Sequence, residues 1–124
     1  MVNRLETGLE GEEKAVLFLR QNGYKILERN ARNSLGELDI VALDKDTVCF
    51  VEVRCRQGVL THSDAFESVN LTKQKKLSKL AVAYLRKKKW FLRRARFDVV
   101  SVLLGADNQV RLIKDAFPVV EKYA

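Results

Sequence analysis

Charged side chains interrupt two short apolar segments in the first half of the chain. Glu37 and Asp39 fall in the first segment, and Glu52 and Arg54 fall in the second. Strand side chains alternate between two faces, so each pair would share one face of its strand. A carboxylate on a buried face is costly unless it is paired with a cation or binds a metal. Neighbouring strands would therefore bring these groups together, either as a structural ion pair or as an oxygen-ligand site suited to Mg²⁺.

The spacing of apolar residues predicts the elements that position these groups. Short polar links join the first three strands, which predicts an antiparallel meander. Residues 29–34 are expected to form a turn, and residues 56–70, which lack periodicity, a surface loop. The order helix, three strands, helix, strand is typical of an α/β fold with one mixed β-sheet flanked by helices. The expected helices span residues 5–21 and 71–88, and the expected strands span residues 24–28, 36–43, 47–55, 96–104 and 109–113.

The first expected helix carries an acidic residue on its apolar side. Glu12 falls between Leu9 and Val16 when the residues are placed at helical spacing. Gly8 and Gly11 lie near the same side, where the missing side chain lets another backbone or a ligand approach closely. Glu12 is therefore a third candidate carboxylate.

Length, charge and cysteines narrow the class of protein. A chain of 124 residues with 47% apolar residues suits one domain over residues 1–124. The formal charge of +7 favours an anionic partner such as nucleic acid, although a merely soluble basic protein is the alternative. Cys49 and Cys55 would lie about 20 Å apart on one strand, too far for a disulfide. Together with the lack of a signal peptide or an apolar stretch of membrane-spanning length, this predicts a cytoplasmic protein without a membrane partner.

Basic residues concentrate in and after the second expected helix. A phosphate-binding surface is the simplest functional interpretation of this charge. Trp90 beside aliphatic residues fits a packed position better than a base-stacking one. His62 is the only histidine and has no Cys or His at ligand spacing, which argues against a zinc site. The candidate nucleic-acid contacts are Lys73, Lys75, Lys76, Lys79, Arg93 and Arg94.

This arrangement resembles the PD-(D/E)XK nuclease superfamily. Asp39 matches the strand Asp of that motif, and the run from Glu52 through Val53 to Arg54 matches (D/E)XK with Arg in place of Lys. Glu12 matches a helix glutamate of archaeal Holliday-junction resolvases. The resemblance implies a restriction-endonuclease-like core in the order α-β-β-β-α-β.

A narrower resemblance covers nearly the whole chain. Several separated motifs look like the YraN family of small bacterial proteins, usually described as predicted endonucleases distantly similar to the resolvases. These motifs lie at residues 8–12, 23–30, 36–42, 50–54, 73–74, 96–100 and 115–117. The resemblance implies a metal-dependent DNA endonuclease, with branched DNA as a candidate substrate, Mg²⁺ as the cofactor and Mn²⁺ as a substitute. By similarity to the resolvases, it also suggests a homodimer.

The resemblance assigns a role to each candidate. Asp39 and Glu52 would be direct metal ligands, with the backbone carbonyl of Val53 as a third. Glu12 would hold a metal-bound water or a second ion. Glu37 and Gln74 would orient the metal ligands through hydrogen bonds without contacting the metal. For Glu37, a solvated strand position is an equal alternative.

The arginine at the motif lysine leaves two functions open. Arg54 stays protonated and presents a planar fork, so we expect it to clamp a phosphate oxygen and not to abstract a proton. Lys73 could supply the missing lysine, or it could be an exposed helix cation. The alternative to an enzyme is a nuclease fold that binds nucleic acid, DNA or RNA, or supports a partner in DNA processing without cutting.

Overall fold

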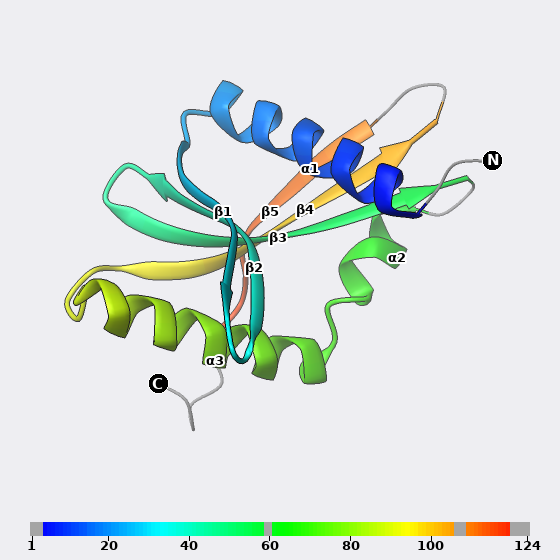
Figure 1. Cartoon of the computed structure of the whole chain (residues 1–124). Helices are drawn as coiled ribbons and strands as arrows, with labels where there is room; N and C mark the ends of the chain where they lie inside the picture. The colour runs from blue at the N-terminus through cyan, green and yellow to red at the C-terminus, as the bar shows by residue number, and fades with distance from the viewer. Residues whose placement is uncertain (1–3, 59–60, 106–108, 120–124) are drawn as a thin grey trace.

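One mixed five-stranded sheet organises the chain, with α1 on one face and α2 and α3 on the other (Figure 1). The computed structural model describes residues 4–58, 61–105 and 109–119. None of the described helices is both long and apolar enough to span a membrane. The elements in chain order are α1 Arg4–Gln21, β1 Lys25–Asn33, β2 Gly36–Asp44, β3 Thr47–Gln57, α2 His62–Glu67, α3 Leu71–Lys88, β4 Ala95–Leu104 and β5 Gln109–Phe117.

The strands lie in the order β1-β2-β3-β4-β5. β3 and β4 are parallel, and the other neighbouring pairs are antiparallel. A parallel pair needs a crossover connection, which α2 and α3 provide. The predicted α/β class, with a mixed sheet flanked by helices and an antiparallel meander over the first three strands, is confirmed. The arrangement is consistent with a restriction-endonuclease-like fold.

Two segments expected to be irregular are ordered elements. β1 runs through the predicted turn at 29–34, because its residues pair with β2 while Asn30 takes a positive φ of 54° within the strand. The predicted loop at 56–70 contains the end of β3 and the helix α2. A capping box between Thr61 and Asp64 starts that helix and satisfies backbone donors at its first turn.

Each face of the sheet buries its own apolar cluster under its helices. Gly11 of α1 faces Cys55 of β3 so closely that a Cβ atom there would lie 2.5 Å from the Cys55 Cβ. The predicted close approach at Gly11 is therefore confirmed. Trp90 packs against the core on the α3 side, with its ring 6.2 Å from that of Tyr84, so its predicted packed position is also confirmed.

A buried polar network ties the start of β4 to its neighbours. The fully buried Asp98 carboxylate accepts hydrogen bonds from Tyr24 Oη at 2.8 Å, Arg96 Nε at 2.9 Å and the Asp115 backbone N–H at 2.9 Å. Arg96 Nη2 also lies 2.7 Å from Asp44 Oδ2. Every partner of Asp98 comes from the fold itself, so this charge on an apolar strand is structural.

Candidate metal and nucleic-acid site

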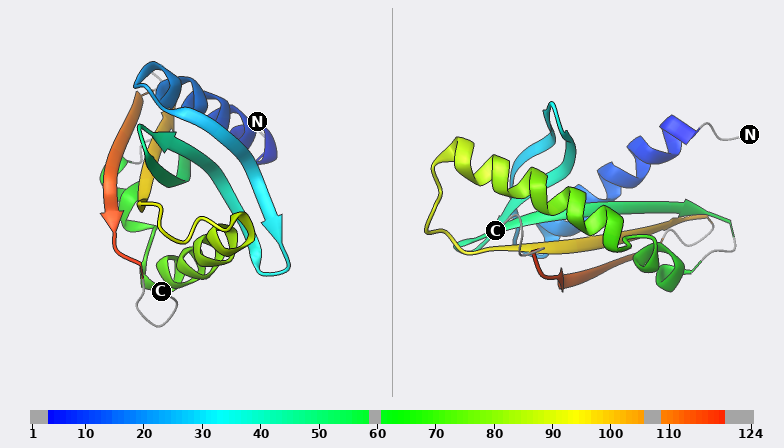
Figure 2. Two further views of the ribbon diagram at one scale, coloured as in Figure 1. Left: turned by 90° about the vertical axis from the view of Figure 1, so that its left-hand side faces the viewer. Right: turned by 90° about the horizontal axis from the view of Figure 1, so that it is seen from below.

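β2 separates from β3 part of the way along its length. Their pairing ends at Ile40 and Val51, after which the β1–β2 hairpin bends toward α3 (Figures 1 and 2). The bend lets Leu38 of the hairpin join the buried cluster on the α3 side. Asp39 therefore lies at the fork between the departing hairpin and β3.

The Asp39 carboxylate accepts a hydrogen bond from a backbone N–H of β3 that lies beyond the last residue pair between β2 and β3. The Val53 N–H donates to Asp39 Oδ2 at 2.9 Å. Burial raises the pKa of Asp39, and the hydrogen bond and negative charge of Glu52 raise it further, while Val53 N–H and Lys73 act in the opposite direction. Two carboxylates this close together favour sharing a proton or binding a cation.

Glu52 receives its cation from α3. Its side chain is only 8% exposed, and Lys73 Nζ lies 3.6 Å from Glu52 Oε2. Lys73 stands in the first turn of α3, where the Asn70 side chain accepts a hydrogen bond from the Lys73 backbone N–H and fixes the helix start. The helix cation thus sits beside the carboxylate pair.

Glu12 of α1 and Asp39 line the same surface groove, which has a volume of about 410 Å³. Glu12 Oε1 accepts hydrogen bonds from Asn30 Nδ2 at 3.0 Å and from Arg29 Nε at 3.4 Å. Both donors belong to β1, so the hairpin holds Glu12 in place. The groove is lined by Gly8, Leu9, Glu12, Asn30, Arg32, Glu37, Asp39, Val53 and Cys55.

The donor set at the fork fits a hard divalent cation with few protein ligands. No three His, Cys, Asp or Glu side chains of the described ranges lie close enough together to hold a metal. Asp39 and Glu52 would therefore act as a pair, and Glu12 is not grouped with them. Mg²⁺ is commonly held by one or two carboxylates and keeps waters or phosphate oxygens in its remaining positions.

The other predicted site residues lie around this pair. Among the ion pairs of the described residues none joins Arg54 to Asp39 or Glu52, and the buried Arg54 Nε has no hydrogen-bond partner. Glu37 lines the groove and pairs with Arg32, with Nε 2.6 Å from Oε2. The amide of Gln74, by contrast, donates to the backbone carbonyl of Val69 at 2.9 Å.

The predicted nucleic-acid contacts fall at two ends of α3. Lys73, Lys75, Lys76 and Lys79 occupy the half of the helix that begins near the fork. Arg93 and Arg94 follow the other end, where the Arg93 guanidinium lies 4.8 Å from the centre of the Trp90 ring. The helix spans about 27 Å at ~1.5 Å per residue, so the two groups form separate basic surfaces.

Sequence reasoning missed the position of His62. It begins α2, and His62 Nδ1 lies 2.6 Å from the Oγ of the buried Ser101 on β4. Burial and the charge of Arg111 lower the pKa of His62. The spacing of Thr61 and Asp64 is the sequence signal that could have predicted the helix, because it matches an acidic capping pair.

Comparison with known proteins places every predicted site residue within one matched region. A model of the "Uncharacterised protein family UPF0102" matches residues 11–102. A UPF0102 protein of Clostridium kluyveri is 43% identical over 117 residues, covering 92% of this chain and 95% of the relative. One from Caldicellulosiruptor saccharolyticus is 43% identical over 119 residues, covering 94% and 100%. A third, from Rhodococcus opacus, is 37% identical over 119 residues with the same two coverages.

Proposed function

Since the chain belongs to UPF0102, the YraN family, we propose that it is a metal-dependent endonuclease that hydrolyses phosphodiester bonds in DNA. The observation that carries this proposal is the carboxylate pair of Asp39 and Glu52 at the strand fork. The raised pKa of Asp39 marks a site that favours a proton or a cation between the two groups. The adjoining basic half of α3 fits a polyanionic substrate.

The residues at the fork divide the work of holding the metal and the substrate. Bound Mg²⁺ would supply activation of a water and stabilisation of charge on the phosphoryl group. Asp39, oriented by the Val53 N–H, and Glu52 would hold the cation together with the Val53 carbonyl. Arg54, whose Nε lacks a partner, would clamp a phosphate oxygen. Glu12 would hold a metal-bound water or a second ion on the α1 side of the groove.

The remaining assignments concern the substrate and the assembly. We propose that Lys73, Lys75, Lys76 and Lys79 contact backbone phosphates near the fork. Arg93 and Arg94 would contact phosphates beyond the other end of α3. Because these cations are proposed to contact backbone phosphates, we expect recognition of DNA shape, including branched DNA. A homodimer would supply two such sites for paired cuts. Neither Cys49 nor Cys55 forms a disulfide, which suits the reducing cytoplasm as the place of action.

The test is cleavage of labelled single-stranded, duplex, flapped and four-way DNA with Mg²⁺ or Mn²⁺. We expect cutting that requires the metal and disappears in Asp39→Asn and Glu52→Gln, while both variants keep DNA affinity. Asp46→Asn is the matched control, because it removes an exposed carboxylate from the turn after β2 and should cut normally. Cutting that persists in both site variants would refute the proposal.

Two observations favour a second candidate function, that of a DNA-binding protein that does not cut. Arg54 replaces the lysine of the nuclease motif, and Lys73 forms an ion pair with Glu52. A binder of this kind would retain DNA affinity in EDTA and show no nicking with Mg²⁺ or Mn²⁺. Restored nicking in Arg54→Lys would then identify the arginine as the cause.

A further inference from the structure

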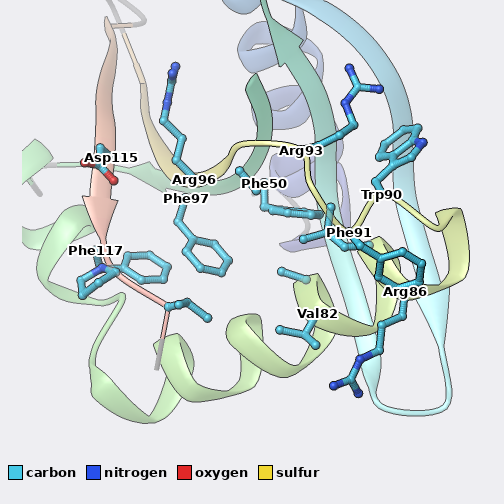
Figure 3. A pocket seen from close by; sticks show the side chains of 15 residues that line it. Phe50, Val82, Arg86, Trp90, Phe91, Arg93, Arg96, Phe97, Asp115 and Phe117 are labelled. Atoms are coloured by element: carbon cyan, nitrogen blue, oxygen red, sulfur yellow. The ribbon is translucent and has the colours of Figure 1, made fainter. Parts of the chain in front are cut away.

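A second cavity lies at the far end of α3 from the carboxylate pair. It has a volume of about 430 Å³ and opens between the end of α3, the segment that follows it, and the neighbouring ends of β4 and β5 (Figure 3). Its floor is apolar and is formed by the side chains of Phe50, Ala81, Phe97 and Phe117. The rings of Phe97 and Phe117 stack with their centres 4.6 Å apart, which gives the cavity a flat aromatic wall.

The segment beside this cavity exposes large apolar side chains. Phe91 lines the cavity and is 70% exposed, and the next residue, Leu92, is fully exposed. Nothing in the described part of the chain fills the cavity or covers these two side chains. An apolar hollow beside exposed apolar residues is typical of an interaction surface.

The lining of the cavity includes three arginines and one exposed acid, Asp115, so its rim is cationic overall. Arg86 and Arg93 both line it, and neither forms an ion pair within the described residues. Arg96 lines it too but is committed to Asp98 and Asp44. The rim therefore offers two guanidinium groups that an incoming ligand could pair with.

Charge and polarity together decide between the candidate occupants. A second copy would bring the same cations to the rim, and residues 120–124, which follow Val119 at the cavity, carry one acid and one base. A nucleobase would leave the hydrogen-bonding groups of its edge unpaired against a carbon floor, which costs free energy. An apolar side chain flanked by acids avoids both penalties.

We propose that this cavity docks an acidic segment of a partner protein through one aliphatic or aromatic anchor side chain. The anchor fills the hollow between α3 and the aromatic wall, and the flanking carboxylates pair with Arg86 and Arg93. The cavity and the fork lie at opposite ends of α3, so a partner held here leaves the carboxylate pair open and competes with DNA only for Arg93 among the proposed phosphate contacts. The proposal goes beyond the nuclease activity and does not depend on it.

The first test is selection of random peptides of roughly 12 residues displayed on phage against the full-length protein. We expect enrichment of sequences with a Phe, Leu, Ile or Trp flanked by Asp and Glu. A synthetic peptide of the enriched sequence should change the fluorescence of Trp90, the only tryptophan, which lines the cavity. Its affinity should fall with rising salt, because ion pairs at the rim contribute to binding.

Variants assign the peptide to the cavity. Val82→Glu places a carboxylate in the cavity lining, and Arg86→Glu and Arg93→Glu reverse the exposed rim charges without disturbing the core. Each should weaken binding by at least about tenfold, whereas Lys25→Glu, an exposed charge reversal on β1, should leave it unchanged. Circular dichroism of each variant checks that it is folded.

Four results would overturn the proposal. The first is selection that enriches no acidic sequences. The second is peptide binding that both arginine reversals leave intact. The third is displacement of the peptide by a thymidine oligonucleotide that changes Trp90 fluorescence in the wild-type protein but not in Val82→Glu. That result would assign the cavity to nucleic acid. The fourth is self-association that Val82→Glu abolishes, which would assign it to a second copy.

Discussion

Replacing Asp39 with Asn should stabilise the metal-free protein at alkaline pH. In the folded protein the pKa of Asp39 is raised from its ordinary value of 3.8 to about 8, by burial first and by Glu52 second. A carboxyl group with a raised folded-state pKa favours folding when it is protonated. Its contribution is complete below the unfolded pKa and is lost as the pH rises through the folded pKa. The wild-type protein in EDTA should therefore lose stability between about pH 4 and pH 8.

The size of this loss follows from the two pKa values. A group protonated in the folded state and ionised in the unfolded state changes the unfolding free energy by at most ~1.4 kcal/mol per pH unit. Between about pH 6 and about pH 8 the wild-type protein should lose roughly 2 kcal/mol. An Asn at this position cannot ionise, yet its amide oxygen can still accept the Val53 N–H and its NH₂ can donate to Glu52. At about pH 8 the variant should be the more stable protein by roughly 1–2 kcal/mol.

A divalent cation should reverse that order. Mg²⁺ at about ten times its dissociation constant stabilises a folded protein by ~1.4 kcal/mol if it binds only the folded state. The wild-type protein should gain this stabilisation, and Asp39→Asn should not, because one of the two ligands is then neutral. Urea unfolding followed by circular dichroism at several pH values, with EDTA or with Mg²⁺, measures both effects.

Asp98→Asn is the matched control, since it neutralises another buried strand carboxylate. Asp98 is satisfied by Arg96, Tyr24 and a backbone N–H, so its loss should cost about 3 kcal/mol whether or not Mg²⁺ is present. The reasoning about the fork fails if Asp39→Asn is the less stable protein at about pH 8 in EDTA. It fails equally if the variant keeps the wild-type dependence on pH or on Mg²⁺.

Three further predictions concern the packing around the site, the reactivity of a buried thiol and the contact with DNA. Gly11→Ala should destabilise the protein by about 2 kcal/mol in urea unfolding, because its Cβ would press on Cys55, whereas Gly8→Ala, with open space around it, should gain about 0.5–1 kcal/mol. Burial raises the pKa of Cys49 to about 12, so mass spectrometry should find it unlabelled by iodoacetamide at about pH 8 until the protein is unfolded. Lys75→Gln should weaken DNA binding and lower the slope of log affinity against log salt by about 1; an unchanged slope would remove this residue from the interface.

Charged residues in the apolar strands are of two kinds that residue spacing alone cannot separate. Asp39, Glu52 and Asp98 all interrupt apolar strands, so the penalty of burying a carboxylate applies to each. Asp98 is satisfied within the fold, by Tyr24 from 74 positions away and by Arg96. Whether a buried carboxylate has a protein cation or needs an external one depends on tertiary contacts of this kind, which residue spacing does not record.

The elements were predictable where one local signal dominated. The long helices and the central strands follow their apolar periodicity, whereas residues 29–34 combine turn-forming residues with a strand pairing that only β2 reveals. The capping pair of Thr61 and Asp64 could have been recognised from the sequence, and it separates a helix from the expected loop. The bend that takes the hairpin away from β3 depends on burying Leu38 against α3, a contact between distant segments.

Charge at the fork links the metal to the substrate. Asp39 and Glu52 carry two negative charges when ionised, Lys73 offsets one of them, and a divalent cation would leave one positive charge in excess. A phosphodiester carries one negative charge, so binding it would offset that excess, and Arg54 would add a further cationic donor. We therefore expect Mg²⁺ and DNA each to raise the affinity of the other, as any coupling between two ligands must be reciprocal. Titration of Mg²⁺ with and without a phosphorothioate duplex measures this coupling. Equal Mg²⁺ affinities would show that the DNA phosphate does not bind close enough to Asp39 and Glu52 to interact with their charge.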